Sequence, residues 1–244
     1  MKVLAIGAHP DDADLYAGGL VAALAEAGAD VSMADLTAGE MATRGSPELR
    51  ATEAAEAARI LGVSSRECLG LPDGGIRRTD PDQTRALVEL MRKHRPGLIL
   101  APWEEDLHPD HRETHHLVRR ARFFARVGGF PADGATVRPG PVLFYEQKIP
   151  FDPDLVVDVG AVREKKLAAV AAFASQFRRD EGDPLPTEIS DPEFHAMLEA
   201  RARERGGRIG VTWGEGYRRE SPQAVRDVRH LLEEAPAVSP RAEA

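Results

Sequence analysis

The chain has 244 residues, of which 42% are hydrophobic, enough for the core of one domain over residues 1–232, followed by a flexible tail over residues 233–244. Its net charge of -8 and the mixing of arginine with glutamate argue against the broad basic face that nucleic acids require. The single cysteine, Cys68, cannot form an internal disulfide, and no stretch approaches the roughly 20 apolar residues of a membrane span. We therefore expect a cytoplasmic protein that binds neither nucleic acids nor membranes.

The first quarter of the chain predicts strands and helices in alternation. Residues 2–7 form a short continuous apolar run, which is typical of a strand buried on both faces of a parallel sheet. Apolar residues at helical spacing then predict a helix over residues 15–27, and a second strand is expected over residues 31–36. A serine followed by a proline predicts the start of another helix, over residues 47–61.

The same alternation continues through the rest of the chain. Further strands are predicted over residues 67–71, 97–101, 142–145 and 155–159, and further helices over residues 81–94, 162–173 and 192–205. Residues 127–140 are rich in glycine and proline and are expected to form a long loop, either a lid or a wall of the substrate site. Strands that alternate with helices of this length favour an α/β fold, Rossmann-like, with a largely parallel sheet.

Two short motifs stand at the ends of predicted strands. The HPDD motif, residues 9–12, directly follows the first strand, and the HPDH motif, residues 108–111, lies just beyond the strand over residues 97–101. Parallel strands deliver their carboxyl ends to one edge of the sheet, where ligand sites form. We therefore expect the two motifs to lie together.

The residue types in these motifs point to a metal site. Two imidazoles and one carboxylate, with a position left open for water, form a common site for a divalent cation. His9 and Asp12 have a suitable spacing, and the third ligand would come from the HPDH motif. Asp11 and His108 would then stand beside the ion, free to move protons. The motifs together predict metal-dependent hydrolysis.

Two other classes of function remain open at this point. A Rossmann-type nucleotide-binding module would have a glycine-rich turn after the first strand and Asp35 on the ribose. His9 and Asp12 stand where two of those glycines belong, and the carboxylates nearby would repel a pyrophosphate. The second class is the non-haem iron oxygenases, which also use two histidines and one carboxylate.

Two further histidines follow the HPDH motif. His111 and His115 are four residues apart, a spacing at which two helical side chains can bind one metal ion. We instead expect His115 and His116 to lie on a solvent-facing helix surface.

Longer segments of the chain resemble a known family. AHPDDADLYAGG, DLTAGEMATRGSPELR, LPDGG and HPDH are similar to the LmbE/PIG-L family of metal-dependent N-acetylglucosaminide deacetylases, and the resemblance covers nearly the whole chain. EKKLAAVAAFASQF and GVTWGEGY resemble the branch that deacetylates N-acetylglucosaminyl malate in bacillithiol biosynthesis. The resemblance implies a Rossmann-like fold, a small-molecule GlcNAc conjugate as substrate, and a homo-oligomer, commonly a trimer or hexamer. The malate conjugate is preferred; the alternatives are a GlcNAc-inositol, a chitooligosaccharide and a glycopeptide sugar.

The resemblance also implies a role for most motif residues. His9, Asp12 and His111 match the metal ligands of the family, and the expected ion is Zn²⁺, although Fe²⁺, Co²⁺ or Mn²⁺ would support the same hydrolysis. Asp11 matches the general base and His108 the second catalytic residue. A protonated His108 would help to stabilise the oxyanion that forms on the acetamide.

Residues around the motifs extend this picture. Asp110 is predicted to be a third catalytic residue, which would hydrogen-bond His108 and raise its pKa; the alternative is that it caps the following helix. Arg50 matches an arginine near the sugar site of the family and is predicted to contact the substrate. Arg44 and Asp73 are weaker candidates for contacts with the sugar.

Two positions bear on the rest of the substrate. Arg178 and Arg179 are candidates to bind the carboxylates of malate. Some relatives supply a tyrosine hydroxyl to the oxyanion from the segment where this chain has Phe194, which has no hydroxyl. His108, or His195 as a substitute, would then carry more of that stabilisation.

Overall fold

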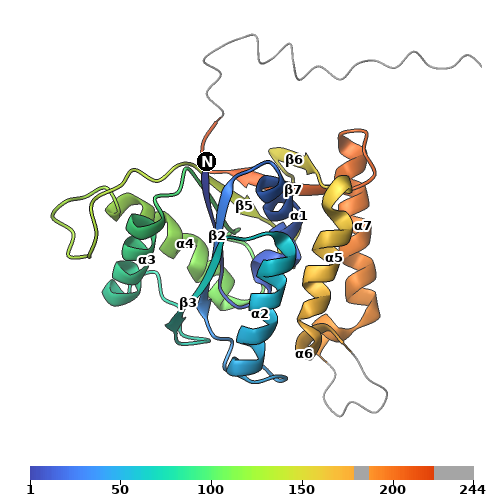
Figure 1. The fold of residues 1–244 in the computed structure, drawn as a ribbon, viewed down its shortest axis with the longest axis horizontal. Helices are drawn as coiled ribbons and strands as arrows, with labels where there is room; N and C mark the ends of the chain where they lie inside the picture. The colour runs from blue at the N-terminus through green and yellow to red at the C-terminus, as the bar shows by residue number, and fades with distance from the viewer. Residues whose placement is uncertain (179–186, 223–244) are drawn as a thin grey trace, which may run out of the picture.

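The computed structural model describes residues 1–178 and 187–222, so the predicted tail over residues 233–244, and Arg179, lie outside the described part. Within that part, seven strands form one sheet in the order β3-β2-β1-β4-β5-β7-β6 (Figure 1). The strands are β1 (Lys2–Gly7), β2 (Asp30–Thr37), β3 (Ser65–Leu71), β4 (Leu98–Pro102), β5 (Val142–Tyr145), β6 (Leu155–Asp158) and β7 (Gly214–Arg219).

Helices cover both faces of this sheet, which confirms the predicted Rossmann-like α/β fold (Figure 1). The α-helices are α1 (Asp12–Glu26), α2 (Pro47–Leu61), α3 (Pro81–His94), α4 (Pro109–Phe124), α5 (Arg163–Ala172), α6 (Ala174–Phe177) and α7 (Pro192–Arg208). Two short 3₁₀ helices are η1 (Gly160–Val162) and η2 (Glu188–Ser190). None of the helices in residues 1–178 and 187–222 is long and apolar enough to cross a bilayer.

The order of the strands brings the two motifs to one place. β1 is central and pairs in parallel with β2 on one side and with β4 on the other. The chain runs from β1 outwards to β2 and β3 and then returns to β4, so the direction of winding reverses between β1 and β4. Loops that leave adjacent strands at such a switch point form a crevice at the carboxyl edge of the sheet. The HPDD motif follows β1 and the HPDH motif follows β4.

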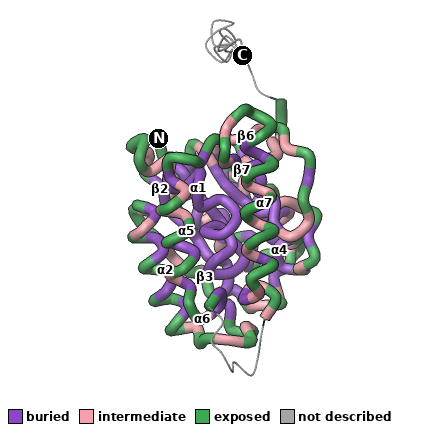
Figure 2. Tube along the Cα trace, turned by 90° about the vertical axis from the view of Figure 1, so that its right-hand side faces the viewer, coloured by how far each residue is buried: buried purple, intermediate pink, exposed green. Residues whose placement is uncertain are grey.

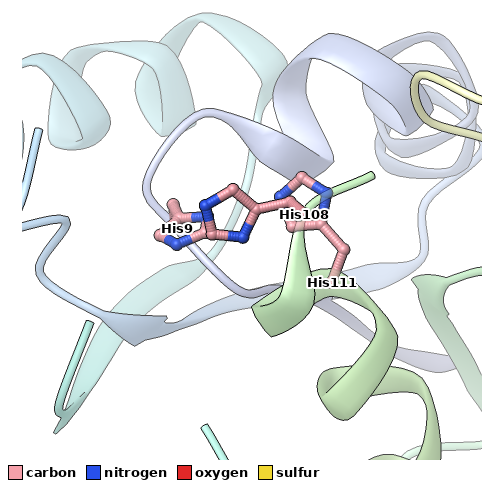
Figure 3. Close-up of side chains that lie close together, drawn as sticks. All are labelled: His9, His108 and His111. Atoms are coloured by element: carbon pink, nitrogen blue, oxygen red, sulfur yellow. The ribbon is translucent and has the colours of Figure 1, made fainter. Parts of the chain in front are cut away.

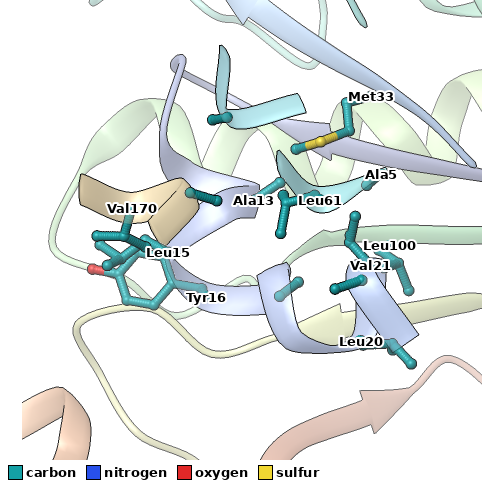
Figure 4. Packing of buried hydrophobic residues seen from close by; sticks show 14 of the residues in the cluster. Ala5, Ala13, Leu15, Tyr16, Leu20, Val21, Met33, Leu61, Leu100 and Val170 are labelled. Carbon is teal, nitrogen blue, oxygen red and sulfur yellow. The ribbon is translucent and has the colours of Figure 1, made fainter. Parts of the chain in front are cut away.

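The core lies on both faces of the sheet because successive side chains of a strand point to opposite sides. Val3 and Ala5 of β1 belong to the cluster that packs against α1, α2 and α5, part of which Figure 4 shows. Leu4 and Ile6 belong to the cluster on the other face, which is formed with α3 and α4. Figure 2 shows the consequence for α1, which is buried along most of its length and lies behind α5 and α7. A helix held in this way gives the HPDD motif at its start a rigid support.

One strand of the sheet, β7, was not predicted, because its sequence GEGYRR contains two glycines and no regular alternation of apolar and polar residues. The strand forms because it pairs antiparallel with both β5 and β6. Gly214 also allows α7 to approach closely, since a Cβ atom there would lie 2.7 Å from the backbone nitrogen of Gly206.

The loop over residues 127–140 is not a lid over the motifs in this chain. Arg92, near the end of α3, donates hydrogen bonds to the carbonyls of Val127 and Gly134. The backbone nitrogen of Gly140 donates to the carbonyl of Pro96, just before β4 begins. These contacts hold the loop at the amino edge of the sheet, opposite the HPDD and HPDH motifs, so the prediction of a lid or a wall of the substrate site is wrong.

Candidate functional site

Three imidazoles meet at the carboxyl edge of the sheet. His9 comes from the loop between β1 and α1, whereas His108 and His111 come from the start of α4 (Figure 3). The ring centroids of His9 and His108 are 4.7 Å apart, those of His108 and His111 are also 4.7 Å apart, and those of His9 and His111 are 5.3 Å apart. The structure thus brings together side chains that are about 100 positions apart in the sequence, as the topology predicted.

Asp12 lies between two of these rings. Its Oδ1 atom is 3.2 Å from His111 Nε2, and its Oδ2 atom is 3.4 Å from His9 Nδ1. The other nitrogen of each ring contacts a further carboxylate, with His111 Nδ1 2.8 Å from Asp106 and His9 Nε2 3.1 Å from Asp73. Metal-binding histidines are commonly held by a carboxylate on the ring nitrogen that does not bind the ion. The donor set formed by His9, Asp12 and His111 therefore fits a divalent cation.

The same residues offer a second arrangement. Ligand atoms of His9, His108 and His111 all lie within 4.8 Å of one another, so His108 is close enough to replace Asp12 in a set of three imidazoles. The assignment of His9, Asp12 and His111 remains a prediction, which the contacts of Asp12 with both rings support.

The carboxylates around the imidazole rings shift the pKa values of the groups in the site. Burial lowers the pKa of His111, but Asp12 and Asp106 outweigh this effect and raise the pKa to about 9. Burial likewise opposes protonation of His9, yet hydrogen bonds to carboxylates leave its pKa well above the usual value. The pKa of Asp12 is held well below its usual range, because the nearby His111 and His9 outweigh the opposing effect of burial. The cluster therefore attracts positive charge, which a divalent cation would supply in place of the protons.

Asp11 has an unusual backbone conformation at the tip of the HPDD loop. Its φ angle is 115°, in a region that residues other than glycine rarely adopt. The carboxylate is buried, and burial raises its pKa to about 7, with the lowering effect of Arg50 opposed by repulsion from Asp12. A strained, buried carboxylate with a pKa near neutrality has the properties of a general base.

Arg50 holds this carboxylate in place. Its guanidinium donates to Asp11 Oδ2 at 3.0 Å and to the carbonyls of Pro10 at 2.6 Å and Gly39 at 3.1 Å. Glycine is required at position 39 for Arg50 to reach these partners, because a Cβ atom there would lie 1.8 Å from Arg50 Nη1. The contacts support a positioning role for Arg50 that the sequence did not suggest. Its predicted contact with the substrate stays a prediction.

His108 caps α4 rather than carrying a positive charge. Its Nδ1 atom accepts a hydrogen bond from the backbone nitrogen of Asp110 at 3.3 Å, so the proton of the neutral ring lies on Nε2. Burial, followed by the influence of His111 and His9, lowers the pKa of His108. These contacts favour a neutral His108 that offers an Nε2–H donor, in place of the protonated ring expected from the sequence. The role of His108 as the second catalytic residue stays a prediction.

Asp110 makes different contacts from those expected. Its carboxylate accepts hydrogen bonds from the backbone nitrogens of Gly74 at 2.7 Å and Ile76 at 3.3 Å, and its Oδ2 atom lies 3.5 Å from His9 Nε2. Asp110 does hydrogen-bond the His108 ring, but through its backbone nitrogen, and no bond from its carboxylate to the ring is among the described contacts. The charge of Asp110 acts to raise the pKa of His108, but burial and the neighbouring histidines outweigh it. The helix cap is His108 itself. Asp110 thus fixes the LPDGG turn beside His9, while a catalytic role for it stays a prediction.

Two residues of the site were missed in the sequence. Asp106 binds His111 and also accepts hydrogen bonds from the backbone nitrogens of His108 and Lys148. Gln147 is 1% exposed, and its Nε2 atom donates to Asp12 Oδ1 at 3.2 Å. Asp106 was recognisable as an acid two residues before His108. Gln147 follows β5, the next strand along the same edge, which was the signal that pointed to it.

The weaker candidates for substrate contacts have varied surroundings. Asp73 contacts His9, and this contact lowers the pKa of Asp73 to about 2, so its carboxylate supports the ring. Arg44 donates to the backbone carbonyl of Arg178. Phe194 is buried in the core cluster, and His195 lies against its ring and that of Phe177. The roles in substrate binding predicted for Arg44 and Arg178, and the role in oxyanion stabilisation predicted for His195, stay predictions.

Comparison with known proteins shows which proteins this chain resembles. The family model PIG-L, described as GlcNAc-PI de-N-acetylase, matches residues 4–122, which include both motifs. The diacetylchitobiose deacetylase of Thermococcus kodakarensis is 34% identical over 195 residues, covering 73% of this chain and 71% of the relative. A probable N-acetyl-alpha-D-glucosaminyl L-malate deacetylase 2 of Bacillus cereus is 28% identical, covering 71% of this chain and 83% of the relative.

A relative with another activity and a solved structure complete the comparison. The 4-oxalmesaconate hydratase of Pseudomonas putida is 30% identical over 192 residues, covering 72% of this chain and 74% of the relative. The crystal structure of a conserved protein from Thermus thermophilus superposes with a TM-score of 0.83 at 34% identity. The match covers 91% of this chain and 96% of that protein. The chain is therefore similar both to a deacetylase and to a hydratase.

Proposed function

This chain belongs to the PIG-L/LmbE family and is an enzyme, and we propose that it hydrolyses the N-acetyl group of a small GlcNAc conjugate with the help of a divalent cation. The observation that carries the proposal is the convergence of His9, Asp12 and His111 beside the buried carboxylate of Asp11. Hydrolysis of an amide needs an activated water, a stabilised oxyanion and a proton for the leaving amine. The site contains a residue suited to each task.

His9, Asp12 and His111 are the residues that would hold the ion, and Zn²⁺ suits two imidazoles and one carboxylate best. A bound cation supplies Lewis-acid activation, which lowers the pKa of water toward about 7. Asp73 and Asp106 orient the two rings through their second nitrogens. Fe²⁺, Co²⁺ and Mn²⁺ remain alternatives, because ligand type alone does not select among them.

Asp11 is the proposed base. In its ionised form it accepts a proton from the water that attacks the acetamide carbon, and Arg50 fixes the carboxylate during this transfer. The same proton can then pass from Asp11 to the nitrogen of the amide, because an amine must be protonated before it leaves. The C–N bond breaks, and acetate and the free amine result.

His108 is the proposed oxyanion donor. Its Nδ1 atom is occupied by the backbone nitrogen of Asp110, so the neutral ring can donate only through Nε2–H. A neutral imidazole at a helix N-terminus that polarises a carbonyl is a known catalytic arrangement. Because Phe194 has no hydroxyl to share this task, His108 has more of the stabilisation to provide.

N-acetylglucosaminyl malate is the proposed substrate, with a GlcNAc-inositol, a chitooligosaccharide and a glycopeptide sugar as alternatives. The segments EKKLAAVAAFASQF and GVTWGEGY and the Bacillus cereus relative support the malate conjugate. The greater identity to the diacetylchitobiose deacetylase supports a chitooligosaccharide to a similar degree. Assembly into a trimer or hexamer is part of the proposal and can be checked by light scattering.

An acetate-release assay tests this function. The metal-loaded chain is given N-acetylglucosaminyl malate, diacetylchitobiose, GlcNAc-inositol and free GlcNAc, with the Asp11→Asn variant and a chelator-treated sample as controls. We expect release from the malate conjugate at the highest kcat/KM, lost in both controls and restored by Zn²⁺ after chelation. A higher kcat/KM on another conjugate would keep the chemistry and refute the malate assignment.

The similarity to a hydratase suggests which activity to test if the deacetylase assay is negative. If no acetate is released from any conjugate although the metal is bound, the deacetylase proposal fails. Hydration of 4-oxalmesaconate by the same sample would then identify the activity as addition of water, as the name of that relative suggests.

A further inference from the structure

A second cluster of potential ligands lies further along α4. Glu104, His115 and His116 place one ligand atom each within 4.8 Å of one another. His115 was expected on a solvent-facing surface, but it is only 1% exposed, so that expectation is wrong for His115. His115 is buried because its ring packs against Trp103 and Phe144, with centroids 5.3 Å and 4.2 Å away.

His115 and His111 belong to different sites although they are one helical turn apart. His111 turns its two nitrogens to Asp12 and Asp106. His115 turns Nδ1 to the carbonyl of Pro102 at 3.1 Å, while its Nε2 atom lies 3.8 Å from Glu104 Oε2. His111 and His115 therefore do not form a ligand pair for a single metal ion.

The hydrogen bond to Pro102 determines which nitrogen of His115 is available. A carbonyl can only accept, so Nδ1 carries the proton and Nε2 has a free lone pair. Among the described residues, the polar group that faces Nε2 is Glu104, at a distance beyond a normal hydrogen bond. This is the arrangement that prepares a histidine to bind a metal ion, with one nitrogen held by a carbonyl and the other free.

From this geometry we infer that Glu104, His115 and His116 form a second site for a divalent cation, with Zn²⁺ as the ion of choice. Two imidazoles and one carboxylate are a zinc ligand set that leaves room for water. Burial lowers the pKa of His115 to about 4, so the ring is neutral near pH 7, as a ligand must be. Arg78 and Arg119 oppose positive charge at the two histidines. Each is paired with a glutamate, Arg78 with Glu113 and Arg119 with Glu220, which limits its repulsion of a cation.

Occupation of this site would link two parts of the molecule. Glu104 lies on the loop between β4 and α4, whereas both histidines lie within α4. The same loop carries Asp106, which orients His111. An ion at the second site would therefore fasten this loop to the helix and stabilise the folded chain.

Zinc binding to the tag-free, full-length chain tests the inference. Calorimetry and metal analysis after dialysis would be carried out on the wild type, on Asp12→Asn, and on Asp12→Asn combined with Glu104→Gln or His116→Ala. Asp12→Asn removes one ligand of the first site, and because His108 could replace it, the second site is identified by the binding that is lost when Glu104→Gln or His116→Ala is added. Both substitutions at the second site affect partly exposed side chains, and Glu105→Gln, one residue further along the loop and exposed, is the matched control.

We expect two Zn²⁺ per wild-type chain and one in Asp12→Asn. Glu104→Gln and His116→Ala should each weaken the remaining site at least tenfold, whereas Glu105→Gln should not change it. Zn²⁺ should also raise the Tm of Asp12→Asn, and this rise should disappear in the two combined variants. Equal binding and an equal rise in Tm with and without Glu104 and His116 would refute the second site.

The fluorescence of Trp103 reports independently on where the ion binds. In a Trp213→Phe background its fluorescence should be quenched by Cu²⁺, because the ring lies beside His115, and Zn²⁺ should reverse the quenching by competition. His116→Ala should remove the tight phase of this quenching. Tight quenching that survives both His116→Ala and Glu104→Gln would mean that the ion binds elsewhere, and the inference would fail.

Discussion

Asp12 and Asp14 are two residues apart at the start of α1, and both are buried, yet their surroundings differ in kind. Asp14 is bound at 2.9 Å by both terminal nitrogens of Arg66, which also binds Asp35 at 2.8 and 2.9 Å. Asp12 instead faces the rings of His9 and His111. The cluster of Asp14, Asp35 and Arg66, called the Arg66 cluster, has a guanidinium as its cation. The cluster of Asp12, His9 and His111, called the Asp12 cluster, has imidazoles.

This difference separates a structural cluster from one that can do chemistry. A guanidinium does not lose its proton in a protein, so the cation of the Arg66 cluster is permanent, and the cluster serves to hold α1, β2 and β3 together. Imidazoles can lose their protons, so the Asp12 cluster can exchange them for a metal ion. The same engagement with Arg66 removes Asp35 from the ribose-binding role that a nucleotide site would need.

The largest expected effect concerns Asp11. Asp11→Asn keeps the size of the side chain and removes the base, so we expect the rate of acetate release to fall by about 10²–10⁴-fold. Stability should change little, because burial disfavours the Asp11 charge, the amide oxygen of asparagine can still accept from Arg50, and asparagine tolerates a positive φ angle. Steady-state kinetics and urea unfolding measure the two quantities.

Asp30→Asn is the control, because Asp30 is exposed at the start of β2. If Asp11→Asn lost so much unfolding free energy that unfolding alone accounted for its slower acetate release, the distinction between a structural and a chemical cluster would be contradicted.

Arg66→Met tests the structural cluster. Removal of the guanidinium leaves Asp14 and Asp35 buried without their cation, and breaking a buried ion pair in this way costs about 3–5 kcal/mol of unfolding free energy. The deacetylase rate per folded molecule should change little. Arg59→Met removes an exposed arginine paired with Glu56 and should cost less than about 1 kcal/mol. Equal losses in the two variants would show that the Arg66 cluster does not hold the fold.

The same distinction explains how far the sequence could predict the site. The meeting of the HPDD and HPDH motifs follows from parallel topology, which apolar runs and helical periods reveal. The direction of a side chain depends on backbone groups that are distant in the sequence. Asp110 turns to the nitrogens of Gly74 and Ile76, and no pattern around residue 110 could indicate that. Most strand and helix positions were predictable, but β7 was not, since its pairing replaces the missing alternation.

His115 extends the comparison to a titrating group in the core. Its pKa is lowered to about 4 by burial, against about 6.5 in the unfolded chain. Below pH 6.5 the unfolded chain binds a proton that the folded chain does not, so stability is complete above this pH and is lost as the pH falls toward 4. The loss from this group amounts to about 3 kcal/mol.

Urea unfolding between pH 7 and 4, in the presence of a chelator, would measure this loss. His115→Phe, which fits between Trp103 and Phe144, should show a correspondingly smaller decrease than the wild type. Parallel curves for the two proteins would exclude a contribution from His115.

The smallest expected effect concerns Arg50, and it decides between two roles. Arg50→Lys keeps the charge but cannot reach Asp11, Pro10 and Gly39 together, so the base is held less well. If Arg50 positions Asp11, kcat should fall about tenfold with little change in KM. Arg50 lowers the pKa of Asp11, so a weaker contact raises this pKa, and the acidic limb of the pH–rate profile should move to higher pH. A rise in KM with an unshifted profile would instead assign Arg50 to the substrate, as the sequence predicted. Arg59→Lys, at an exposed position of the same helix, serves as the control.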